Sequence, residues 1–271
     1  MPRRGRNDPP VLKRFGQHFL HDSDVLGAIA NAVDPMPGET IIEIGPGRGA
    51  LTNLIVGKSE RFIAVEIDRA LAAQLAEKYG GNPRVQIVEA DVLETDLPDL
   101  AAGPFVVVGN VPYYITTPIL FHVLKPPFPR HAVFLVQREV ADRIAAAPGS
   151  RAYGALSVNV QAISDAEIIR RVPPSAFKPA PKVDSAVIRI TPRPEGLIVA
   201  EEVRAFRIFV QAAFGMRRKQ ILNVLRAIRN ISSADAANAI EGINVDPAAR
   251  PETMTPSEFV QLMRATLPLT K

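Results

Sequence analysis

The sequence predicts an α/β fold with a doubly wound parallel sheet, followed by a small all-helical domain. From about residue 24 to 188, short apolar runs alternate with helical stretches, which is typical of strands joined by crossover helices. A Pro-rich break, TPRPEG, follows at Thr191–Gly196. Beyond this break the apolar residues recur with a helical period. We therefore expect two domains of different architecture in one chain.

The predicted strands are short apolar runs bounded by turn residues. The first two are TIIEI and RFIAVEI, and they are followed by the helical stretches ALTNLIVGK and DRALAAQLAEKY. Later runs end in acidic or polar residues, and VDSAVIRI alternates as a late strand. The six expected strands are 40–44, 61–67, 85–88, 105–108, 132–137 and 183–190.

The helical period after the break defines the predicted second domain. Its apolar positions are Val203, Phe206, Val210 and Phe214, then Ile221, Leu222, Leu225 and Ile228. We expect three parts: a basic N-terminal arm at 1–22, the α/β domain at 23–192 and the helical domain at 195–271.

Composition narrows the class of protein. The chain of 271 residues has no cysteine, which excludes disulfides, thiolate zinc sites and a cysteine nucleophile. No apolar run has membrane-spanning length and the N-terminus does not resemble a signal peptide, so we expect a cytoplasmic protein. The formal net charge of +4 is divided as +3 over residues 1–22, −3 over 23–188 and +4 over 189–271. Basic ends favour a polyanionic partner, although ordinary solvated surface charge is the alternative.

A glycine-rich turn follows the first predicted strand. Gly45 begins a G-x-G-x-x-A pattern, Glu66 lies 21 residues later at the end of the second strand, and Asp91 follows the third. Such acids are placed to accept ribose hydroxyls and an adenine amino group. NAD is one candidate, which would make a dehydrogenase. Glu43 favours a cationic ligand such as S-adenosylmethionine instead, because an acid would repel a pyrophosphate. An ordinary Gly-rich turn with incidental acids is the third interpretation.

The run VVVGNVPYYIT places Asn110, Pro112 and Tyr113 at the carboxyl end of the fourth strand, where ligands collect in such sheets. The Asn110 side-chain oxygen could accept hydrogen bonds from a nucleobase amine and so direct the nitrogen lone pair at a methyl group. Pro112 would fix the turn, and Tyr113 could stack on the base. The alternative is a strand that simply ends in a turn.

These residues resemble the ribosomal RNA adenine N6,N6-dimethyltransferases. The resemblance rests on FGQHFL, EIGPGRGALT, VEID, EAD, GNVPYYITTPIL, SRAYGALSVNVQ, VPPSAFKPAPKVDSAV and AAFGMRRKQILNVL, and it covers nearly the whole chain. It implies a Rossmann-like class I methyltransferase fold and S-adenosylmethionine as cofactor. Within the family, the chain is most similar to enzymes that dimethylate two adjacent adenines near the 3′ end of small-subunit (16S) rRNA during ribosome biogenesis.

The resemblance also implies roles for individual residues. The N-terminal arm would form a flap over the cofactor, which would be bound by His18, Leu20, Gly45, Glu66, Asp91 and Asn110. The target adenine would contact Asn110, Tyr113 and Phe177, next to the turn fixed by Pro112. For Phe177, which lies among prolines, simple loop packing is the alternative. Apart from the resemblance, the basic charge of the C-terminal part favours phosphate contacts by Arg217, Arg218 and Lys219, for which a solvated helix face is the alternative. Tyr114 and Met216 depart from the family pattern, which often has Asn or Gln at the first position and Gln at the second.

Other functions stay open on the sequence alone. A large-subunit (23S) rRNA adenine N6-methyltransferase, which confers macrolide-type resistance, would share fold, cofactor and chemistry. A non-catalytic assembly factor built on this fold is less consistent with intact Glu66, Asp91 and Asn110. The four histidines lack metal-ligand spacing, so we expect no metal. We expect a monomer that acts on small-subunit rRNA, within a pre-30S or 30S particle, and not on a membrane.

Overall fold

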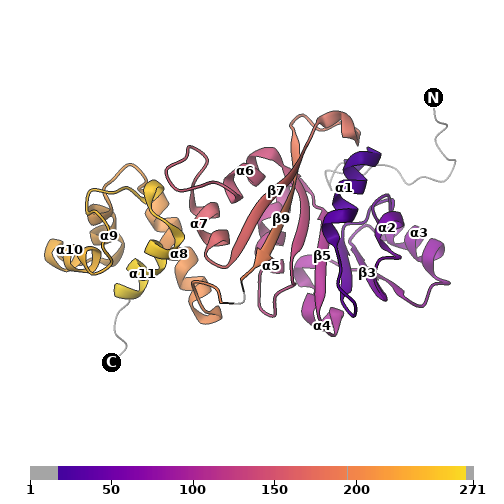
Figure 1. Ribbon diagram of the computed structural model, residues 1–271, viewed down its shortest axis with the longest axis horizontal. Helices are drawn as coiled ribbons and strands as arrows, with labels where there is room; N and C mark the ends of the chain where they lie inside the picture. The colour runs from indigo at the N-terminus through magenta and orange to yellow at the C-terminus, as the bar shows by residue number, and fades with distance from the viewer. Residues whose placement is uncertain (1–17, 194, 267–271) are drawn as a thin grey trace. The chain divides into compact units, whose positions relative to one another are not determined.

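The chain forms a sheet unit and a helical unit, shown in the computed structural model of Figure 1, which describes residues 18–193 and 195–266. The sheet unit contains the described residues up to Ala141 together with Glu167–Thr191. The helical unit contains Asp142–Ala166 and the described residues from Pro192 onward. The chain therefore leaves the sheet unit and returns to it before the Pro-rich break.

The sheet unit is built on a seven-stranded sheet of order β4-β3-β2-β5-β6-β9-β7. Five neighbouring strands of this sheet run parallel to one another, in the order β4, β3, β2, β5 and β6. β2, β5 and β6 are buried along almost their whole length, as expected for strands covered on both faces. The strands are β2 Thr40–Ile44, β3 Arg61–Glu66, β4 Val85–Glu89, β5 Phe105–Asn110, β6 Ala132–Gln137, β7 Ser164–Val172 and β9 Ser185–Pro192.

All six predicted strands are present, but the expectation of parallel strands is wrong for the last one. β9 pairs antiparallel with β6, with Ala132 opposite Ile190. The segment between β7 and β9 contains only a short 3-10 turn and the two-residue β8 (Phe177–Lys178). A parallel connection needs a crossover of a dozen or more residues, usually a helix, and this segment provides no helix. The sequence pattern also missed β7.

Helices follow the strands at the expected places in the sheet unit. Asp22 and Asp68 cap the first turns of α1 and α3, each accepting hydrogen bonds from two backbone N–H groups. The stretch ALTNLIVGK forms only a single turn of helix, shorter than expected. The helices are α1 Ser23–Val33, α2 Thr52–Ile55, α3 Arg69–Tyr79, α4 Leu97–Ala101, α5 Thr116–Val123 and α6 Arg138–Ile144.

A two-stranded sheet joins the start of the described chain to a distant loop. β1 (Phe19–Leu20) pairs antiparallel with β8, with Leu20 opposite Phe177. The Leu20 and Phe177 side chains enter the same hydrophobic core as α1 and the central strands. Strands of two residues have no readable periodicity, so the sequence pattern could not predict this pairing.

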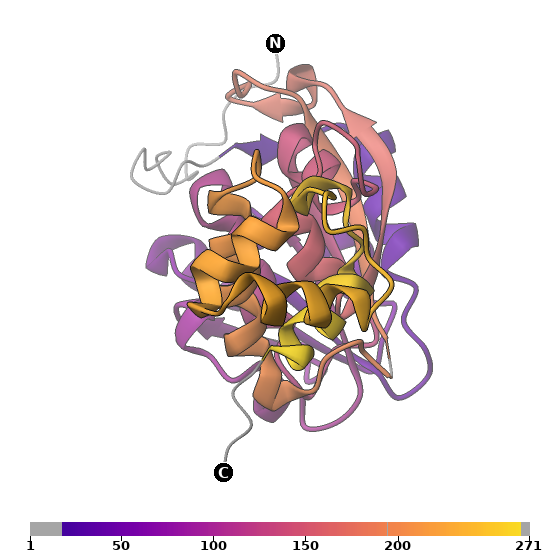
Figure 2. The ribbon, with the colours of Figure 1, turned by 90° about the vertical axis from the view of Figure 1, so that its left-hand side faces the viewer.

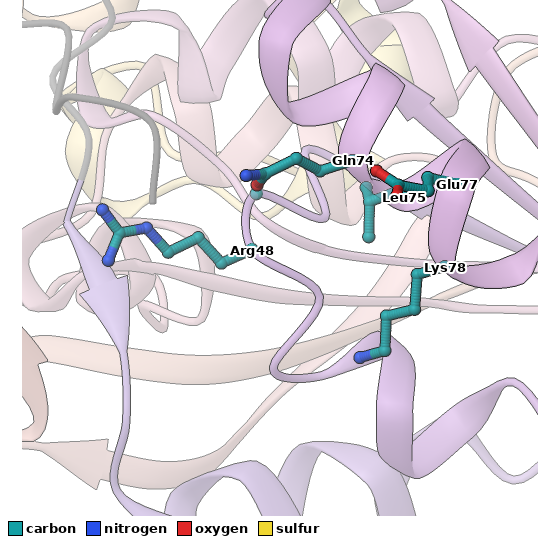
Figure 3. Close-up of a pocket in the computed structure, with 6 residues that line it drawn as sticks. Arg48, Gln74, Leu75, Glu77 and Lys78 are labelled. Atoms are coloured by element: carbon teal, nitrogen blue, oxygen red, sulfur yellow. The ribbon is translucent and has the colours of Figure 1, made fainter. Parts of the chain in front are cut away.

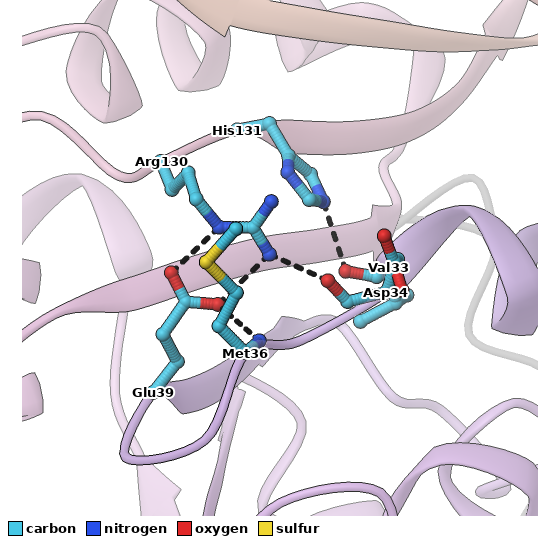
Figure 4. Close-up of polar contacts among 6 residues, drawn as sticks. All are labelled: Val33, Asp34, Met36, Glu39, Arg130 and His131. Atoms are coloured by element: carbon cyan, nitrogen blue, oxygen red, sulfur yellow. Dashed lines mark hydrogen bonds and ion pairs between the residues drawn. The ribbon is translucent and has the colours of Figure 1, made fainter.

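The amino edge of the sheet is held by an ion pair, shown in Figure 4. The Arg130 guanidinium donates from Nε to Glu39 Oε1 at 2.7 Å and from Nη2 to Oε2 at 2.8 Å. Glu39 Oε2 also accepts from the Met36 backbone N–H, and His131 Nε2 donates to the Val33 carbonyl. These bonds join the end of α1 to the beginnings of β2 and β6. The opposite, carboxyl edge is left for the site described below.

The helical unit contains five complete α-helices among its described residues, of which α8 to α11 are drawn in orange and yellow in Figure 2. They are α7 Ala155–Gln161, α8 Val203–Gly215, α9 Ile221–Arg229, α10 Ser233–Glu241 and α11 Pro256–Ala265. The Phe259 ring contacts both Phe209 and Phe214, and the Tyr153 ring packs against Phe214. In the described ranges, no helix is long and apolar enough to cross a membrane.

The two units differ from the predicted domains in the segments that they include. The helical unit begins at Pro192, close to the predicted boundary, but it also includes Asp142–Ala166, which the sequence analysis assigned to the α/β domain. The physical reason is packing: α7 contacts α8 and α11, and the Tyr153 hydroxyl donates to the Met254 carbonyl at 2.8 Å. Local sequence patterns do not report contacts between segments 100 residues apart.

Candidate functional site

A cavity of about 490 Å³ opens at the carboxyl ends of the parallel strands in the sheet unit. Its wall is formed by the turns after β2, β3, β4 and β5, together with the segment around β1. Eight residues singled out by the sequence line it: His18, Leu20, Gly45, Glu66, Asp91, Asn110, Pro112 and Tyr113. Ligands of doubly wound sheets bind at this edge.

The glycine turn after β2 brings bare backbone to the cavity. Gly45 and Gly47 have positive φ angles of 64° and 58°, which side chains rarely tolerate. A Cβ atom on Gly47 would lie only 3.2 Å from the Phe19 ring. The Gly47 N–H donates to Glu66 Oε2 at 3.0 Å, so the turn and the end of β3 are held together. The turn therefore exposes main chain, not side chains, to a ligand.

Glu66 is fixed by backbone groups on both carboxylate oxygens. Oε1 accepts from the Asp68 N–H at 2.9 Å, while Oε2 accepts from Gly47. Each carboxylate oxygen has two lone pairs, so each can accept a further hydrogen bond from a ligand. Burial raises the pKa of Glu66, whose side chain is almost fully enclosed. The position suits a pair of hydroxyls.

Glu43 lies one strand away and is buried even more deeply. Burial raises the pKa of its carboxyl group to about 8, and the neighbouring Glu66 adds to the shift. The Thr52 hydroxyl donates to Glu43 Oε2 at 2.6 Å, which opposes the shift only in part. At neutral pH the group is therefore largely protonated, and a cationic ligand in the cavity would favour its ionised form.

Asp91 begins the 3-10 turn Val92–Glu94 after β4. Its Oδ1 accepts from the Leu93 N–H at 2.9 Å and caps this turn. Within the described part of the chain, no other group binds its side chain, so Oδ2 is available on the cavity wall. A carboxylate oxygen in this position can accept a hydrogen bond from an exocyclic amine.

Asn110 is the last residue of β5 and is held by the N-terminal segment. Its Nδ2 donates to the His18 carbonyl at 3.1 Å. Among the described residues this is its one side-chain hydrogen bond, which leaves Oδ1 as an uncommitted acceptor on the cavity wall. Gly109, just before it, passes so close to β2 that a Cβ would lie 2.8 Å from the Ile44 carbonyl oxygen.

Tyr113 is positioned from two sides. Its hydroxyl shares a hydrogen bond of 2.6 Å with Ser185 Oγ at the start of β9. Its ring stacks on the His18 ring, with centroids 5.9 Å apart and an interplanar angle of 23°. Burial raises the pKa of Tyr113, although the bond with Ser185 acts the other way. The phenol therefore stays neutral. Tyr113 also lines the cavity.

The segment His18–His21 crosses the cavity and is attached to the loop around β8. His18 Nδ1 donates to the Pro179 carbonyl at 2.8 Å, and the His21 N–H donates to the Ala176 carbonyl at 2.9 Å. The residues of the predicted arm before His18, including its basic side chains, lie outside the described residues. The part that is described lies against the cavity, where the flap was expected.

Phe177 is the exception among the predicted site residues. Its side chain is 2% exposed and packs in the hydrophobic core with Leu20 and Ala176, and it does not line the cavity. Phe177 is therefore not part of the cavity wall, and its contact with the target base stays a prediction. Successive side chains of β8 point to opposite sides, so Phe177 turns into the core while Lys178 turns away from it. Lys178, its neighbour, lines the cavity instead.

The predicted phosphate-binding residues lie in the turn between α8 and α9 of the helical unit. Arg217 is ion-paired with Glu252 at 2.9 Å. Arg218 and Lys219 are exposed. The structure therefore leaves two of these three cations at the surface of this turn without a side-chain partner among the described residues.

Sequence reasoning missed Ile67, which lines the cavity directly after Glu66 with 49% of its surface exposed. Tyr114, which the sequence singled out without a role, also lines the cavity and is 61% exposed. Ser185, which holds Tyr113, lies 72 residues further along the chain. A large apolar residue directly after the strand-end acid is the signal that could have found Ile67. No local pattern could have found Ser185.

A second hollow lies beside the glycine turn, as Figure 3 shows. Gln74, Leu75, Glu77 and Lys78 reach it from α3, while Arg48 extends away from them. The Arg48 guanidinium lies over the Phe19 ring, 4.5 Å from its centroid. Lys78 Nζ donates to Asn53 Oδ1. None of the predicted acids or amides lines this hollow, so the cavity at the strand ends is the candidate site.

Comparison with known proteins finds relatives that match nearly the whole chain. The family model "Ribosomal RNA adenine dimethylase" matches residues 11–265. The chain is 42% identical over 259 residues to a ribosomal RNA small subunit methyltransferase A of Acinetobacter baylyi, covering 94% of this chain and 92% of that protein. It is 42% identical over 265 residues to the protein of the same name from Xanthomonas axonopodis pv. citri, covering 95% and 97%.

Solved structures show the same architecture. The 23S rRNA methyltransferase ErmE superimposes with a TM-score of 0.73 and 28% identity, covering 92% of this chain and 99% of that one. A dimethyladenosine transferase from Plasmodium falciparum superimposes with a TM-score of 0.78 and 22% identity, covering 90% and 96%. At this lower identity the second likeness concerns the fold alone. The predicted fold class is confirmed.

Proposed function

Because the chain belongs to the ribosomal RNA adenine dimethylase family, we propose that it transfers methyl groups from S-adenosylmethionine to the N6 amines of two adjacent adenines. We place these adenines in the 3′-terminal hairpin loop of small-subunit (16S) rRNA. The proposal is supported by relatives at 42% identity named small subunit methyltransferase A, against 28% for the 23S enzyme ErmE. Methylation would occur during biogenesis of the small subunit.

The cavity suits S-adenosylmethionine by the chemistry of its wall. The fixed Glu66 carboxylate can accept hydrogen bonds from the two ribose hydroxyls, and Asp91 Oδ2 can accept one from the adenine amino group. Gly45 and Gly47 let the ligand approach bare backbone, and Glu43 offers a counter-charge to a cation. His18 and Leu20 would cover the ligand. When bound there, the cofactor supplies an electrophilic methyl group.

The observation that carries the proposed chemistry is the free Oδ1 of Asn110 in this same cavity. The lone pair of an adenine amine is delocalised into the ring, which makes the amine a poor nucleophile. Hydrogen bonds from the amine to Asn110 Oδ1 and to the main-chain carbonyl near Val111 would favour a tetrahedral nitrogen whose lone pair is free. Pro112 sets the turn that presents these acceptors.

Tyr113 would hold the target base by stacking, since its ring is fixed by Ser185 and His18. The new N–C bond forms as the C–S bond of the donor breaks, and the amine then releases its extra proton to water. No strong base is required for this step, because the methylated nitrogen is acidic. The exposed Arg218 and Lys219 of the helical unit would contact RNA phosphates.

The deciding experiment supplies labelled S-adenosylmethionine with unmethylated small subunits, large subunits and the protein-free rRNAs. We expect label in two adjacent adenines of small-subunit RNA. Label only in large-subunit RNA would replace this proposal with the large-subunit activity, for which the fold likeness to ErmE is the specific observation. Comparing particles with protein-free RNA in the same series identifies the form of substrate that the enzyme accepts.

A further inference from the structure

Two consecutive tyrosines at the cavity have opposite environments. The Tyr113 ring is half-buried, and its hydroxyl and ring face both have partners. Tyr114 also lines the cavity, but 61% of its surface is exposed. Within the described ranges, no hydrogen bond or ring contact holds its side chain. The fold therefore uses Tyr113 as part of its wall and leaves Tyr114 standing at the cavity mouth.

The other tyrosines show that this exposure is unusual for the chain. The chain has four tyrosines. The hydroxyls of Tyr79, Tyr113 and Tyr153 bond to Asn53, Ser185 and the Met254 carbonyl respectively. An aromatic ring left in water gives up the stabilisation that burial would provide. Because Tyr114 packs against no core, stability gives no reason for an aromatic ring at this position.

We propose that Tyr114 binds the RNA base next to the target adenine by stacking on it, which keeps the strand in register at the cavity mouth. This inference rests on the proposed function and adds a substrate-binding residue to it. The η3 turn Tyr113–Ile115 presents two rings from consecutive residues, about 3.8 Å apart at their Cα atoms. Because the two residues are adjacent, a base that precedes or follows the one held by Tyr113 lies within reach of Tyr114.

Base extrusion gives the stacking a physical purpose. When the target adenine leaves the stack, its neighbour loses a stacking partner, and unstacking costs free energy. An aromatic side chain can replace that partner, and such stacking tolerates any base because every base has a π-face. It also tolerates methylation at N6. The same ring could therefore support either adenine of the pair while the other is in the cavity.

The first test compares Tyr114→Ala and Tyr114→Phe with wild type on unmethylated small subunits. We expect Tyr114→Ala to lower kcat/KM about 5- to 100-fold, with S-adenosylmethionine affinity in calorimetry unchanged within about twofold. Tyr114→Phe should stay close to wild type, because stacking needs the ring and not the hydroxyl. Leu54→Ala is the control: Leu54 is 45% exposed in the same unit but does not line the cavity.

The second test removes the base instead of the ring. Small subunits are reconstituted with a synthetic 3′ segment that carries an abasic nucleotide on the 5′ or the 3′ side of one target adenine. If Tyr114 stacks on that base, wild type loses activity on one abasic substrate, and Tyr114→Ala shows no additional loss on it. Equal effects of the variant on intact and both abasic substrates would overturn the inference, as would weaker cofactor binding that accounts for the whole loss.

The controls separate this inference from the proposed function. Failure of wild type to label small subunits would contradict the proposed substrate, and the same cycle would then use whichever RNA is labelled. Activity of wild type together with an unchanged Tyr114→Ala would contradict only the role of Tyr114. If Tyr114→Phe loses as much activity as Tyr114→Ala, a hydrogen-bonding role for the hydroxyl replaces stacking.

Discussion

The side-chain amide of Asn110 donates a hydrogen bond to the main-chain carbonyl of His18, 92 residues earlier in the chain. This bond links the end of β5 to the segment that crosses the cavity. It also decides the direction of the carboxamide, because Nδ2 is committed to the protein and Oδ1 is left for a ligand. One residue thus takes part in closing the cavity and offers the acceptor on which the proposed chemistry depends.

Replacing Asn110 should separate chemistry from cofactor binding. We expect Asn110→Ala to lower the methylation rate at least about 100-fold, the usual effect of deleting one group that stabilises developing charge. Most S-adenosylmethionine affinity should remain, because Glu66 and Asp91 are untouched. Single-turnover rates and calorimetric affinities measure the two effects. Asn31→Ala, an exposed asparagine on α1, should behave as wild type. Near wild-type transfer by Asn110→Ala would contradict the role given to Oδ1.

Asp91→Asn tests the adenine contact with little change to the fold. The amide keeps one oxygen to cap the Leu93 N–H but replaces the other oxygen with an NH₂ group, which cannot accept from the adenine amine. We expect S-adenosylhomocysteine to bind about tenfold more weakly or worse. The hypoxanthine analogue carries a carbonyl in place of the amine and should lose less or gain affinity. Equal losses for both ligands would show that Asp91 does not contact this part of the base.

Glu43 should make the stability of the ligand-free chain fall as pH rises. Burial raises its pKa from 4.5 to about 8. Between these values the folded chain keeps a proton that the unfolded chain has released, so the free energy of unfolding decreases with pH by up to about 1.4 kcal/mol per pH unit. Glu43→Gln lacks this contribution. Urea unfolding at pH 5.5 and 7.5 should show a smaller decline in the variant, whereas parallel profiles would contradict the shift. The raised pKa of Glu66 acts in the same direction in both proteins.

The Glu39–Arg130 ion pair should matter for stability and not for methyl transfer. Burial alone would raise the pKa of Glu39, yet the bonds from Arg130 and from the Met36 N–H hold it below its ordinary value. A lowered carboxyl pKa stabilises the fold above the unfolded pKa, and this contribution is lost as pH falls through the folded value. We expect Glu39→Gln to lower the free energy of unfolding by about 1–3 kcal/mol at pH 7, with the difference narrowing in acid.

The matched control for this ion pair is on the surface. Arg138 Nη1 and Asp184 Oδ2 lie 2.6 Å apart, and the two side chains are 56% and 42% exposed. Asp184→Asn should change the free energy of unfolding by no more than about 1 kcal/mol, because solvent screens exposed pairs. Chemical denaturation of both variants at pH 7 and pH 4 gives the comparison. A Glu39→Gln variant no less stable than Asp184→Asn would show that the buried pair contributes little.

Sequence patterns predicted the features that depend on residues close together in the chain. Apolar runs placed the strands, and the residues that follow them, Gly45, Glu66, Asp91 and Asn110, lie together because parallel strands bring their carboxyl ends to one edge of the sheet. The long motifs predicted the family, and the comparisons confirm it. For these features, knowing the strand order of a doubly wound sheet was enough.

Contacts between distant segments were decided only by the tertiary structure. The antiparallel β9, the pairing of Leu20 with Phe177 and the packing of α7 with the C-terminal helices all join residues far apart in the chain. Phe177 lies in the core in a strand that pairs with β1, and Tyr113 is held by a serine 72 residues away. Such pairings depend on which surfaces meet once the chain is folded, whereas local propensity reports only which element each segment forms.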